Sequence, residues 1–236
     1  MRSSPRNEFL HGIQAELPIL VGVIPFGMIY GALALSAGIP ANAAQAMSAI
    51  VFAGSSQFIM AQLWAQQTPI FVILVTVLIV NLRHGLYSAS VAPYMQHLSK
   101  TWKGILSYLL TDEAYAVVIT HYRQESQKAD SISAITTGKQ HLFFLGAGLA
   151  LWVTWQLSTT VGILLGSIIP ESWALDFTLT LTFIALVVPT LKGKPEIVAA
   201  LVGGTVAIIG ASWPLKLGLL CGALAGILAG LWSNRS

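Results

Sequence analysis

Long apolar stretches, separated by short polar or proline- and glycine-containing joints, follow one another along most of this sequence. They fall at about residues 17–38, 41–64, 69–95, 104–122, 141–169, 173–191, 195–212 and 214–232. A helix of about 20 apolar residues crosses a bilayer core of ~30 Å, and unpaired backbone groups exclude an open sheet from lipid. No segment shows the alternation typical of a membrane β-barrel. The pattern therefore predicts an all-α, polytopic membrane helix bundle of about seven or eight transmembrane helices, several of them broken or kinked.

Two features leave the number of crossings open between eight and seven plus a re-entrant piece. The segment at 69–95 is long and is interrupted by a polar stretch at 81–85. The last two segments are short and are joined by a tight corner at 211–214. The polar stretch at 123–139 is too short to be a domain, so we expect residues 1–236 to form one integral-membrane domain.

Composition narrows the class of protein. Hydrophobic residues make up 55% of the chain and charged residues 9%, whereas soluble domains carry about 25% charged residues. The mean hydropathy of +0.74 agrees with this. A soluble enzyme, a nucleic-acid-binding protein and a secreted scaffold are thereby excluded. The single cysteine, Cys221, allows neither an internal disulfide nor a cysteine-based metal cluster, and we expect no cofactor.

The basic residues indicate the orientation of the chain. With a cytoplasmic N-terminus, the cytoplasmic side holds Arg2, Arg6, Arg123, Lys128, Lys139, Lys192, Lys194 and Arg235, and the outer side holds Lys100, Lys103 and Lys216. This asymmetry predicts that both termini are cytoplasmic. The region before the first apolar run is long and contains Glu8 and Glu16, and Pro18 and Pro25-Phe26-Gly27 interrupt the run itself. We therefore expect this run to remain as a helix and not to be removed as a signal peptide.

Ionisable side chains inside apolar segments indicate a site, because charges in hydrocarbon are costly and persist mainly along pathways or in pairs. Asp112 and Glu113 lie near the middle of the segment at 104–122. In a continuous helix, Tyr108, Asp112 and Tyr115 share one stripe, and Glu113 points elsewhere. An acid at this depth is the natural carrier of a proton.

Arg83 interrupts the third segment and admits two interpretations. It pairs with an acid and holds two helices together, or it lines a functional path. The polar stretch from Asn81 to Gly85 is typical of an unwound part of a helix, where free backbone groups hold a ligand. His84 could titrate, although a single histidine in such a place is more often a satisfied hydrogen-bonding residue.

Small and polar residues also gather in the middle of the second segment. Gly54-Ser55-Ser56-Gln57 follows Gln45 and Ser48 on earlier turns, which predicts either close helix packing or a break. Pro25-Phe26-Gly27 is a similar interruption of the first segment. Such helices, together with one acidic helix, predict a cavity near the midplane. Asp176 lies close to a segment end and is expected at the interface.

The candidate substrate and proton pathway therefore comprises nine residues. They are Asp112, Glu113, Arg83, Asn81, His84, Ser55, Ser56, Gln57 and Tyr115. No nucleotide-binding motif of the form G-x-x-x-x-G-K-[ST] occurs in the sequence. ATP is therefore not expected to drive the protein.

Several of these motifs, in this order, resemble the AzlC family. The similar stretches are Pro25-Phe26-Gly27 with Gly31, Met47-Ser48 and Val51-Phe52-Ala53-Gly54 with Ser56-Gln57-Phe58, Asn81-Leu82-Arg83-His84, Ala92-Pro93-Tyr94, and Thr111-Asp112-Glu113 with Tyr115. The resemblance spans nearly the whole chain and is densest over residues 18–115. It implies the large subunit of a bacterial branched-chain amino acid exporter, an inner-membrane permease that works with a small AzlD-type membrane subunit. The substrates so implied are leucine, isoleucine, valine and, in some members, methionine.

The leading interpretation is thus a secondary transporter that exports branched-chain amino acids with proton coupling, and not an enzyme. A channel or scaffold subunit of a membrane complex is an alternative. An intramembrane serine hydrolase would pair Ser55 or Ser56 with His84 and needs the nucleophile within reach of its base; the sequence supports this only weakly.

A stripe of small residues near the C-terminus bears on the partner. Gly218, Gly222, Gly226 and Gly230 recur at every fourth position, a spacing that lets another helix approach closely. The stripe packs within the chain or receives the small subunit, and the resemblance favours the second expectation.

Overall fold

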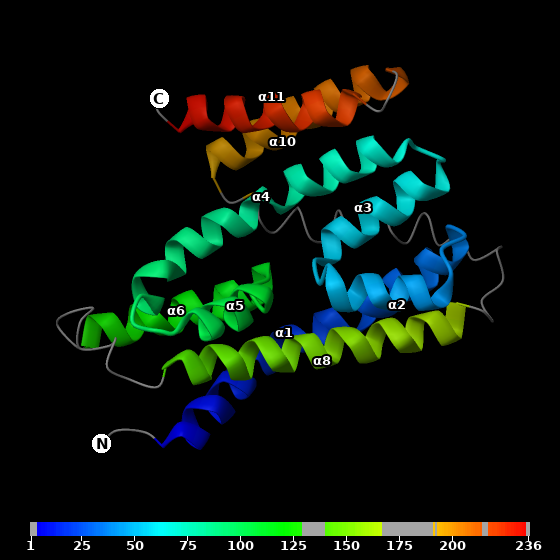
Figure 1. The fold of residues 1–236 in the computed structure, drawn as a ribbon. Coiled ribbons are helices and arrows are strands. Elements are labelled where there is room, and N and C mark those ends of the chain that lie inside the picture. The colour runs from blue at the N-terminus through cyan, green and yellow to red at the C-terminus, as the bar shows by residue number, and fades with distance from the viewer. Residues whose placement is uncertain (1–3, 129–139, 167–190, 192, 214–216, 235–236) are drawn as a thin grey trace. The chain divides into compact units, whose positions relative to one another are not determined.

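The computed structural model in Figure 1 describes residues 4–128, 140–166, 191, 193–213 and 217–234, and every regular element in these ranges is a helix. In chain order the elements are α1 (Pro5–Ser36), α2 (Ala41–Ile50), α3 (Gly54–Ala65), α4 (Ile70–Met95), α5 (Lys100–Tyr108), α6 (Asp112–Lys128), α8 (Gln140–Gly166), α10 (Lys194–Ile209), the 3-10 turn η3 (Gly210–Ser212) and α11 (Leu217–Ser233). The predicted all-α fold class is confirmed. The predicted segment at 173–191, including Asp176, lies outside the described residues.

Four of the described helices are long and apolar enough to cross a membrane. They are α1, α4, α8 and the run Lys194–Ser212 formed by α10 and η3, and α11 adds a shorter apolar helix over Cys221–Ser233. The chain is therefore a multi-pass membrane protein. It divides into two compact units, residues 1–59 with 80–169 and residues 60–79 with 170–236. The expectation of one membrane domain stays a prediction.

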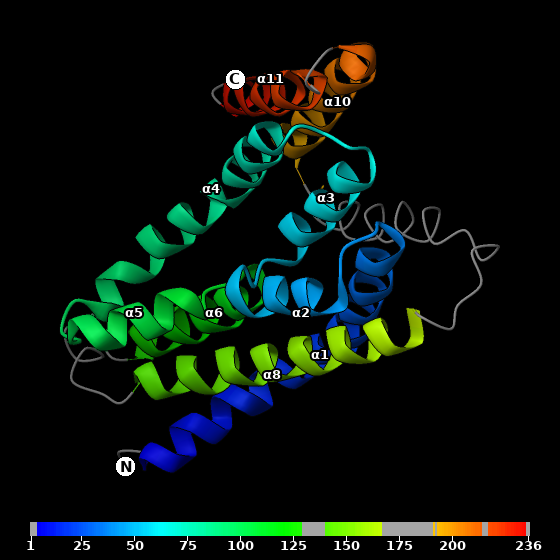
Figure 2. The same cartoon turned by 45° about the vertical axis from the view of Figure 1, so that its right-hand side comes forward.

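The first unit is built on α1 and α8, which pack side by side (Figures 1 and 2). Glycines bring the two backbones together: a Cβ atom on Gly12 would meet the carbonyl oxygen of Phe143, and one on Gly31 would meet that of Thr159. Small residues at such contacts allow close helix packing in a membrane. Because low residue numbers of α1 contact low numbers of α8, the two helices run in the same direction.

The α1 helix continues through both of its prolines, Pro18 and Pro25. The predicted interruption at residues 25–27 is therefore not a break. Gly27 has a packing role instead, since a Cβ atom there would lie 2.7 Å from the Cβ of Ser158 on α8. Close contact with α8 supports the helix where proline removes a backbone hydrogen bond.

The second predicted segment, 41–64, is two helices, because the chain leaves helical geometry at residues 51–53. Phe52 has φ +42°, a left-handed conformation that is unfavourable for a non-glycine residue. Side chains satisfy the carbonyl groups left open at the end of α2. Gln156 Nε2 donates to the Ser48 carbonyl at 3.0 Å, and the Tyr108 hydroxyl donates to the Ala49 carbonyl. The break, one of the two predicted possibilities before Gly54, is thus observed.

The fourth predicted segment, 104–122, is also two helices, so the continuous helix expected there is wrong. The α5 helix ends at Tyr108 and α6 begins at Asp112. Thr111 starts the new helix, since its hydroxyl accepts a hydrogen bond from the Ala114 amide at 3.3 Å. The carboxylates of Asp112 and Glu113 in the first turn favour this helix N-terminus electrostatically. The predicted stripe of Tyr108 with Asp112 is wrong, because the two residues lie on different helices.

The α4 helix is continuous from Ile70 to Met95, so the predicted unwinding at residues 81–85 is wrong. The polar side chains of this stretch have partners on other helices: Ser56 bonds to Asn81, and Asp112 pairs with Arg83. A polar stretch in an apolar helix therefore marks side-chain contacts here, while the backbone keeps its helical hydrogen bonds.

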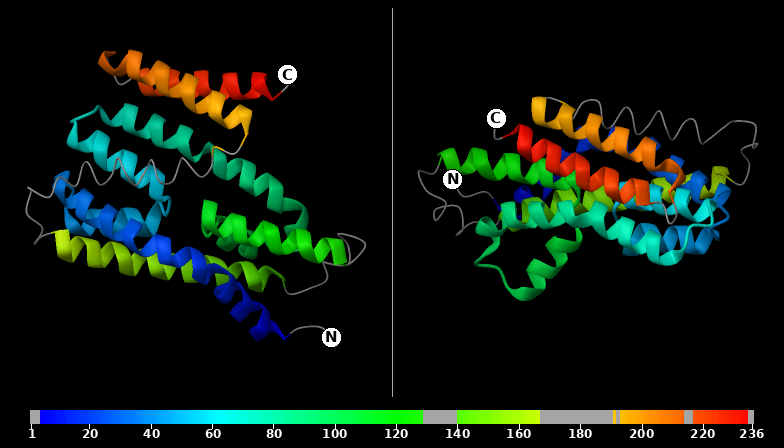
Figure 3. Two further views of the ribbon diagram at one scale, coloured as in Figure 1. Left: turned by 180° about the vertical axis from the view of Figure 1, so that it is seen from behind. Right: turned by 90° about the horizontal axis from the view of Figure 1, so that it is seen from above.

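In the second unit, α10 and α11 form an antiparallel hairpin (Figure 3). The glycine stripe of α11 lies on its contact with α10. A Cβ atom on Gly222 would lie 2.7 Å from the carbonyl oxygen of Gly203, and one on Gly226 would lie 2.8 Å from that of Ala199. The stripe therefore packs within the unit, which corrects the expectation that it receives the small subunit.

Candidate functional site

An ion pair between Arg83 and Asp112 lies at the centre of the candidate site. Arg83 Nη1 lies 2.6 Å from Asp112 Oδ2, and Arg83 Nη2 donates to the Ser55 hydroxyl at 3.1 Å. The predicted pairing of Arg83 with an acid is thus observed, and the acid is Asp112. Their side chains are 28% and 36% exposed, so the pair is partly accessible from outside the bundle. A small ligand with its own charges could reach both partners.

His84 and Asn81 flank this pair on α4. His84 Nε2 lies 3.8 Å from Asp112 Oδ1, too long for a hydrogen bond, and this buried nitrogen has no hydrogen-bond partner among the described residues. Asn81 Oδ1 accepts a hydrogen bond from the Ser56 hydroxyl at 2.7 Å. Ser55, Ser56, Asn81, Arg83, His84 and Asp112 therefore form one polar group, which we call the Arg83 cluster.

Two helix N-termini meet at the Arg83 cluster. The α3 helix begins at Gly54, just before its two serines, and α6 begins at Asp112 itself. Helix N-termini carry a partial positive charge and free amide groups, and both favour anions. The two breaks thus place anion-favouring ends next to a cation inside apolar segments. This arrangement is suited to binding a carboxylate.

Gln57, a predicted site residue, belongs to a different polar group. Its amide donates to the Ser48 hydroxyl at 3.0 Å, and its carbonyl oxygen accepts from the indole nitrogen of Trp155 at 3.2 Å. Ser48 in turn lies 2.8 Å from the Thr159 hydroxyl. Gln57, Ser48 and Thr159 are all fully buried. Because their polar atoms bond to one another, this group holds the break in the second segment against α8.

Tyr115 holds α6 against α4. Its hydroxyl donates to the Ser90 hydroxyl at 3.0 Å, and its ring stacks on that of Tyr87 with centroids 4.5 Å apart. Tyr115 lies about one helical turn after Asp112. It therefore fixes the helix that carries the acid, and does not itself contact the Arg83 cluster in any of the described interactions.

Glu113 interacts electrostatically with a buried acid, Glu16 of α1. The charge of Glu113 acts on Glu16, whose side chain is 0% exposed and whose two oxygens have no hydrogen-bond partner among the described residues. Glu16 is not among the predicted site residues, because the first apolar segment starts at about residue 17, one position after it. The available signal was an acid preceding that segment with no nearby cation.

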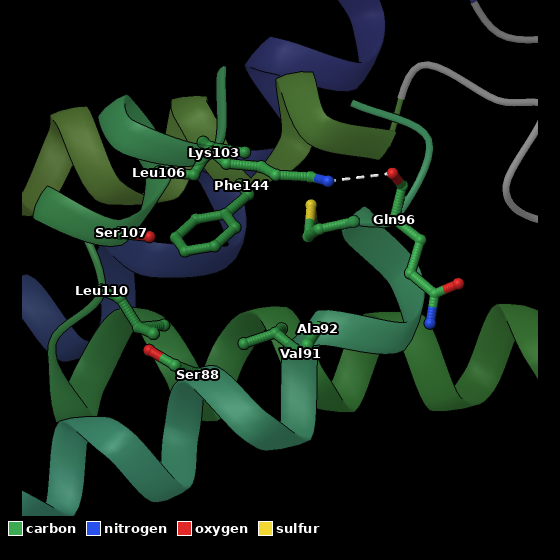
Figure 4. Close-up of a pocket in the computed structure, with 10 residues that line it drawn as sticks. Ser88, Val91, Ala92, Gln96, Lys103, Leu106, Ser107, Leu110 and Phe144 are labelled. Atoms are coloured by element: carbon green, nitrogen blue, oxygen red, sulfur yellow. Dashed lines mark hydrogen bonds between the residues drawn. The ribbon is translucent and has the colours of Figure 1, made fainter. Parts of the chain in front are cut away.

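A cavity of about 290 Å³ lies between α4, α5 and α8 of the first unit (Figure 4). It is lined by Ser88, Val91, Ala92, Met95, Gln96, Lys103, Leu106, Ser107, Leu110 and Phe144. The walls are mostly apolar, and at one edge Lys103 Nζ donates to the Gln96 carbonyl at 2.9 Å. Ser88 follows Arg83 by five positions on α4, an axial rise of about 7.5 Å. The cavity thus begins between one and two helical turns along α4 from the ion pair.

Comparison with known proteins places the chain among membrane proteins. The family model described as AzlC protein matches residues 18–169, a range that contains the whole Arg83 cluster. An uncharacterized membrane protein of Archaeoglobus fulgidus is 30% identical over 234 residues, covering 96% of each chain. The inner membrane protein YgaZ of Escherichia coli is 25% identical over 236 residues, covering 96% of this chain and 92% of its own. No solved structure matches this chain.

Proposed function

This chain belongs to the AzlC family, and from that premise we propose that it is a secondary transporter exporting branched-chain amino acids with proton coupling. The proposed substrates are valine, leucine and isoleucine, with methionine as a further candidate. The proposed location is the bacterial inner membrane, with both termini in the cytoplasm. The proposed partner is a small AzlD-type membrane subunit.

The observation that carries this proposal is the ion pair of Arg83 with Asp112 at the start of α6. A charged pair inside apolar segments usually serves a pathway. Here Asp112 stands at a helix end produced by a break, and Arg83 of the continuous helix α4 bonds to Ser55 in the first turn of α3, next to the other break. Transporters use such helix ends to bind the charged groups of a substrate. The carboxylate of an amino acid would compete with Asp112 for Arg83, and its ammonium group would compete with Arg83 for Asp112.

The nearby cavity is suited to the apolar side chain of such a substrate. Ligand pockets are mostly apolar, with a few polar groups that fix orientation, and Val91, Leu106 and Phe144 supply apolar walls here. Its volume of about 290 Å³ is at the lower end of the usual range of about 300–1,000 Å³. A small amino acid therefore fits this cavity better than a larger solute.

The direction of the helices relates the side of the membrane on which α1 starts to the side on which α8 starts. Because α1 and α8 run in the same direction, two spanning helices at these positions need an odd number of crossings between them. The three predicted segments at 41–64, 69–95 and 104–122 supply that number. If the N-terminus is cytoplasmic, α8 then also starts on the cytoplasmic side, next to the basic stretch at 123–139.

The hydrolase alternative gains no support from the Arg83 cluster. The Ser55 hydroxyl accepts a hydrogen bond from Arg83, and the Ser56 hydroxyl donates to Asn81. Neither serine has a described hydrogen bond to His84, the base that a serine nucleophile requires. A channel or scaffold subunit is the remaining alternative, and a transport assay separates it from an exporter.

The test is export of labelled valine, leucine and isoleucine from proteoliposomes that hold the full chain with its small partner subunit. We expect efflux that depends on a pH gradient, that stops when an ionophore removes the gradient, and that is absent from liposomes without protein. Alanine and lysine serve as control solutes. Efflux of all solutes at similar rates, independent of the gradient, would indicate a channel, and no efflux at all would indicate a scaffold.

A further inference from the structure

Glu16 is a buried acid with no described partner. It lies in the middle of α1, its side chain is 0% exposed, and neither carboxyl oxygen has a hydrogen-bond partner among the described residues. An ionised carboxylate in such surroundings is far less stable than a neutral carboxylic acid, because the charge has lost its water and gained no partner. An acid kept in this environment is typical of a group that binds and releases a proton.

Among the described residues of the helices packed against α1, Glu113 is the group whose charge acts on Glu16, and α6 and α8 also carry the ionisable residues His121 and His141. The α6 helix presents Glu113, whose negative charge acts on Glu16. The α8 helix has no ionisable side chain from Leu142 to Gly166, and α2 has none at all. Arg83 also acts on Glu113, but its guanidinium is bonded to Asp112 and Ser55. Because Glu16 is fully buried and unpaired and also feels the negative charge of Glu113, ionising both carboxyl groups at once is costly, and the two acids together favour holding one proton.

We propose that Glu16 and Glu113 together bind the exchangeable proton of the transport cycle. This assignment rests on the proposed proton-coupled export and names the residues that perform it. Asp112 is not the carrier in this scheme, because its charge is committed to Arg83 and to substrate binding. On loading, a hydronium ion transfers its proton to the carboxylate pair and leaves a water molecule; on unloading, the proton passes back to water.

The route proposed for that water is a hollow that Ala15, the residue before Glu16, helps to line. It has a volume of about 370 Å³ and lies between α1, α6 and α8 of the first unit, with Ala15 and Ile19 on α1 and Ala116 and Thr120 on α6 among its lining residues. Ala15 precedes Glu16 directly, and Ala116 lies one helical turn after Glu113. Towards the end of α6 the lining becomes polar with Thr120, Gln124 and the titratable side chain of His121. The hollow therefore extends from the polar end of α6 towards the turns of α1 and α6 that carry the acids.

Infrared spectroscopy of the full chain in liposomes tests the assignment without any transport. We expect the wild-type protein at neutral pH to show a carboxylic acid C=O stretching band that Glu16→Gln removes. The matched control is Glu196→Gln, which changes an exposed acid at the start of α10 and should leave the band in place. If the wild type lacks the band, or if Glu16→Gln leaves it unchanged, the assignment is overturned.

A second variant covers the case in which Glu16→Gln does not assemble. Glu113→Gln removes the neighbouring charge, so the pH at which the carboxylic acid band disappears should move. An unchanged titration of the band in Glu113→Gln would also overturn the shared proton, because the two acids would then be independent.

Transport then separates this inference from the proposed function. Glu16→Gln should lose gradient-driven valine export but keep exchange of valine for valine, since exchange needs no net proton movement. If Glu16→Gln exports valine along the gradient at the wild-type rate, the assignment of the proton site is overturned and the proposed export function stands. If the carboxylic acid band titrates but the protein transports no branched-chain amino acid, the proposed export function is overturned and the proton-binding site stands.

Discussion

The hydroxyl of Tyr108, the last residue of α5, donates a hydrogen bond to the carbonyl oxygen of Ala49 in the last turn of α2. It also accepts one from the indole nitrogen of Trp152 on α8 at 2.6 Å. The breaks in two predicted transmembrane segments therefore meet at one phenol. The end of one helix supplies the partner that the end of the other has lost.

Removal of the Tyr108 hydroxyl should destabilise the helix ends at both breaks. Tyr108→Phe leaves the Ala49 carbonyl and the Trp152 indole without their partner, and we expect a loss of about 1–3 kcal/mol in the free energy of unfolding. Thermal unfolding in detergent, followed by tryptophan fluorescence, measures it. Tyr94→Phe is the control, because the Tyr94 hydroxyl has no described hydrogen bond. Equal melting temperatures for the two variants would show that the Tyr108 contact does not stabilise the breaks.

A double-mutant cycle should separate the structural role of the ion pair between Arg83 and Asp112 from its functional role. Arg83→Gln leaves the Asp112 carboxylate unpaired, at an expected cost of order 1–3 kcal/mol, between the values for exposed and buried pairs. Arg83→Gln combined with Asp112→Asn should recover stability, because no charge is then left alone. We expect the double variant to be folded and inactive in valine export, since it lacks the groups proposed to hold the substrate's charges.

Thermal stability and export, measured on the same preparations, decide between the outcomes. Arg123→Gln, at an exposed position on α6, controls for loss of a basic residue. Recovery of both stability and transport in the double variant would make the pair a structural link alone. If both single variants had wild-type stability and wild-type export, the ion pair would have neither a structural nor a functional role.

The sequence predicted the partners of the Arg83 cluster better than the backbone that carries them. Charge in apolar segments selected Arg83 and Asp112, and the two are in contact. The same reasoning placed Asp112 in the middle of a helix, whereas it begins one. Thr111 followed by two acids is a helix-start signal, but the apolar run on both sides of it favoured one continuous helix.

Three other errors share a physical cause, which is that a sequence does not show which atoms become partners. The polar stretch at 81–85 could not be distinguished from unwound backbone without its contacts to Ser56 and Asp112. The glycine stripe of α11 is equally suited to any helix, and α10 occupies it. Glu16 lay just outside its predicted segment, and only the fold, in which α6 packs against α1, lets the charge of Glu113 act on it.

The cavity of Figure 4 should respond to a larger side chain in its wall. Ala92→Phe would fill part of its volume of about 290 Å³, so leucine and isoleucine export should fall more than valine export. Ala89→Phe is the control: Ala89 lies on the same helix at an exposed position and does not line the cavity. The rates for the three amino acids, compared within each variant, measure the effect. Equal losses for all three, or the same pattern in Ala89→Phe, would place the apolar part of the substrate elsewhere.

The contact of α11 with α10 predicts what large side chains in the glycine stripe will do. A Cβ atom on Gly222 or Gly226 already meets backbone oxygens of α10 within 2.8 Å, so leucine at either position would force the two helices apart. Overpacking of this kind costs about 1–3 kcal/mol per site, and we expect Gly222→Leu with Gly226→Leu to lower expression and the melting temperature. Ala223→Leu adds the same side chain at an exposed position of α11 and should have little effect on stability.

Co-purification with the small subunit gives this experiment its second measurement. Loss of the subunit from the double leucine variant should accompany the loss of stability, because the stripe is already occupied by α10. If the double variant instead kept the wild-type melting temperature and lost only the small subunit, the stripe would be the surface that receives the partner, and its packing against α10 would be wrong.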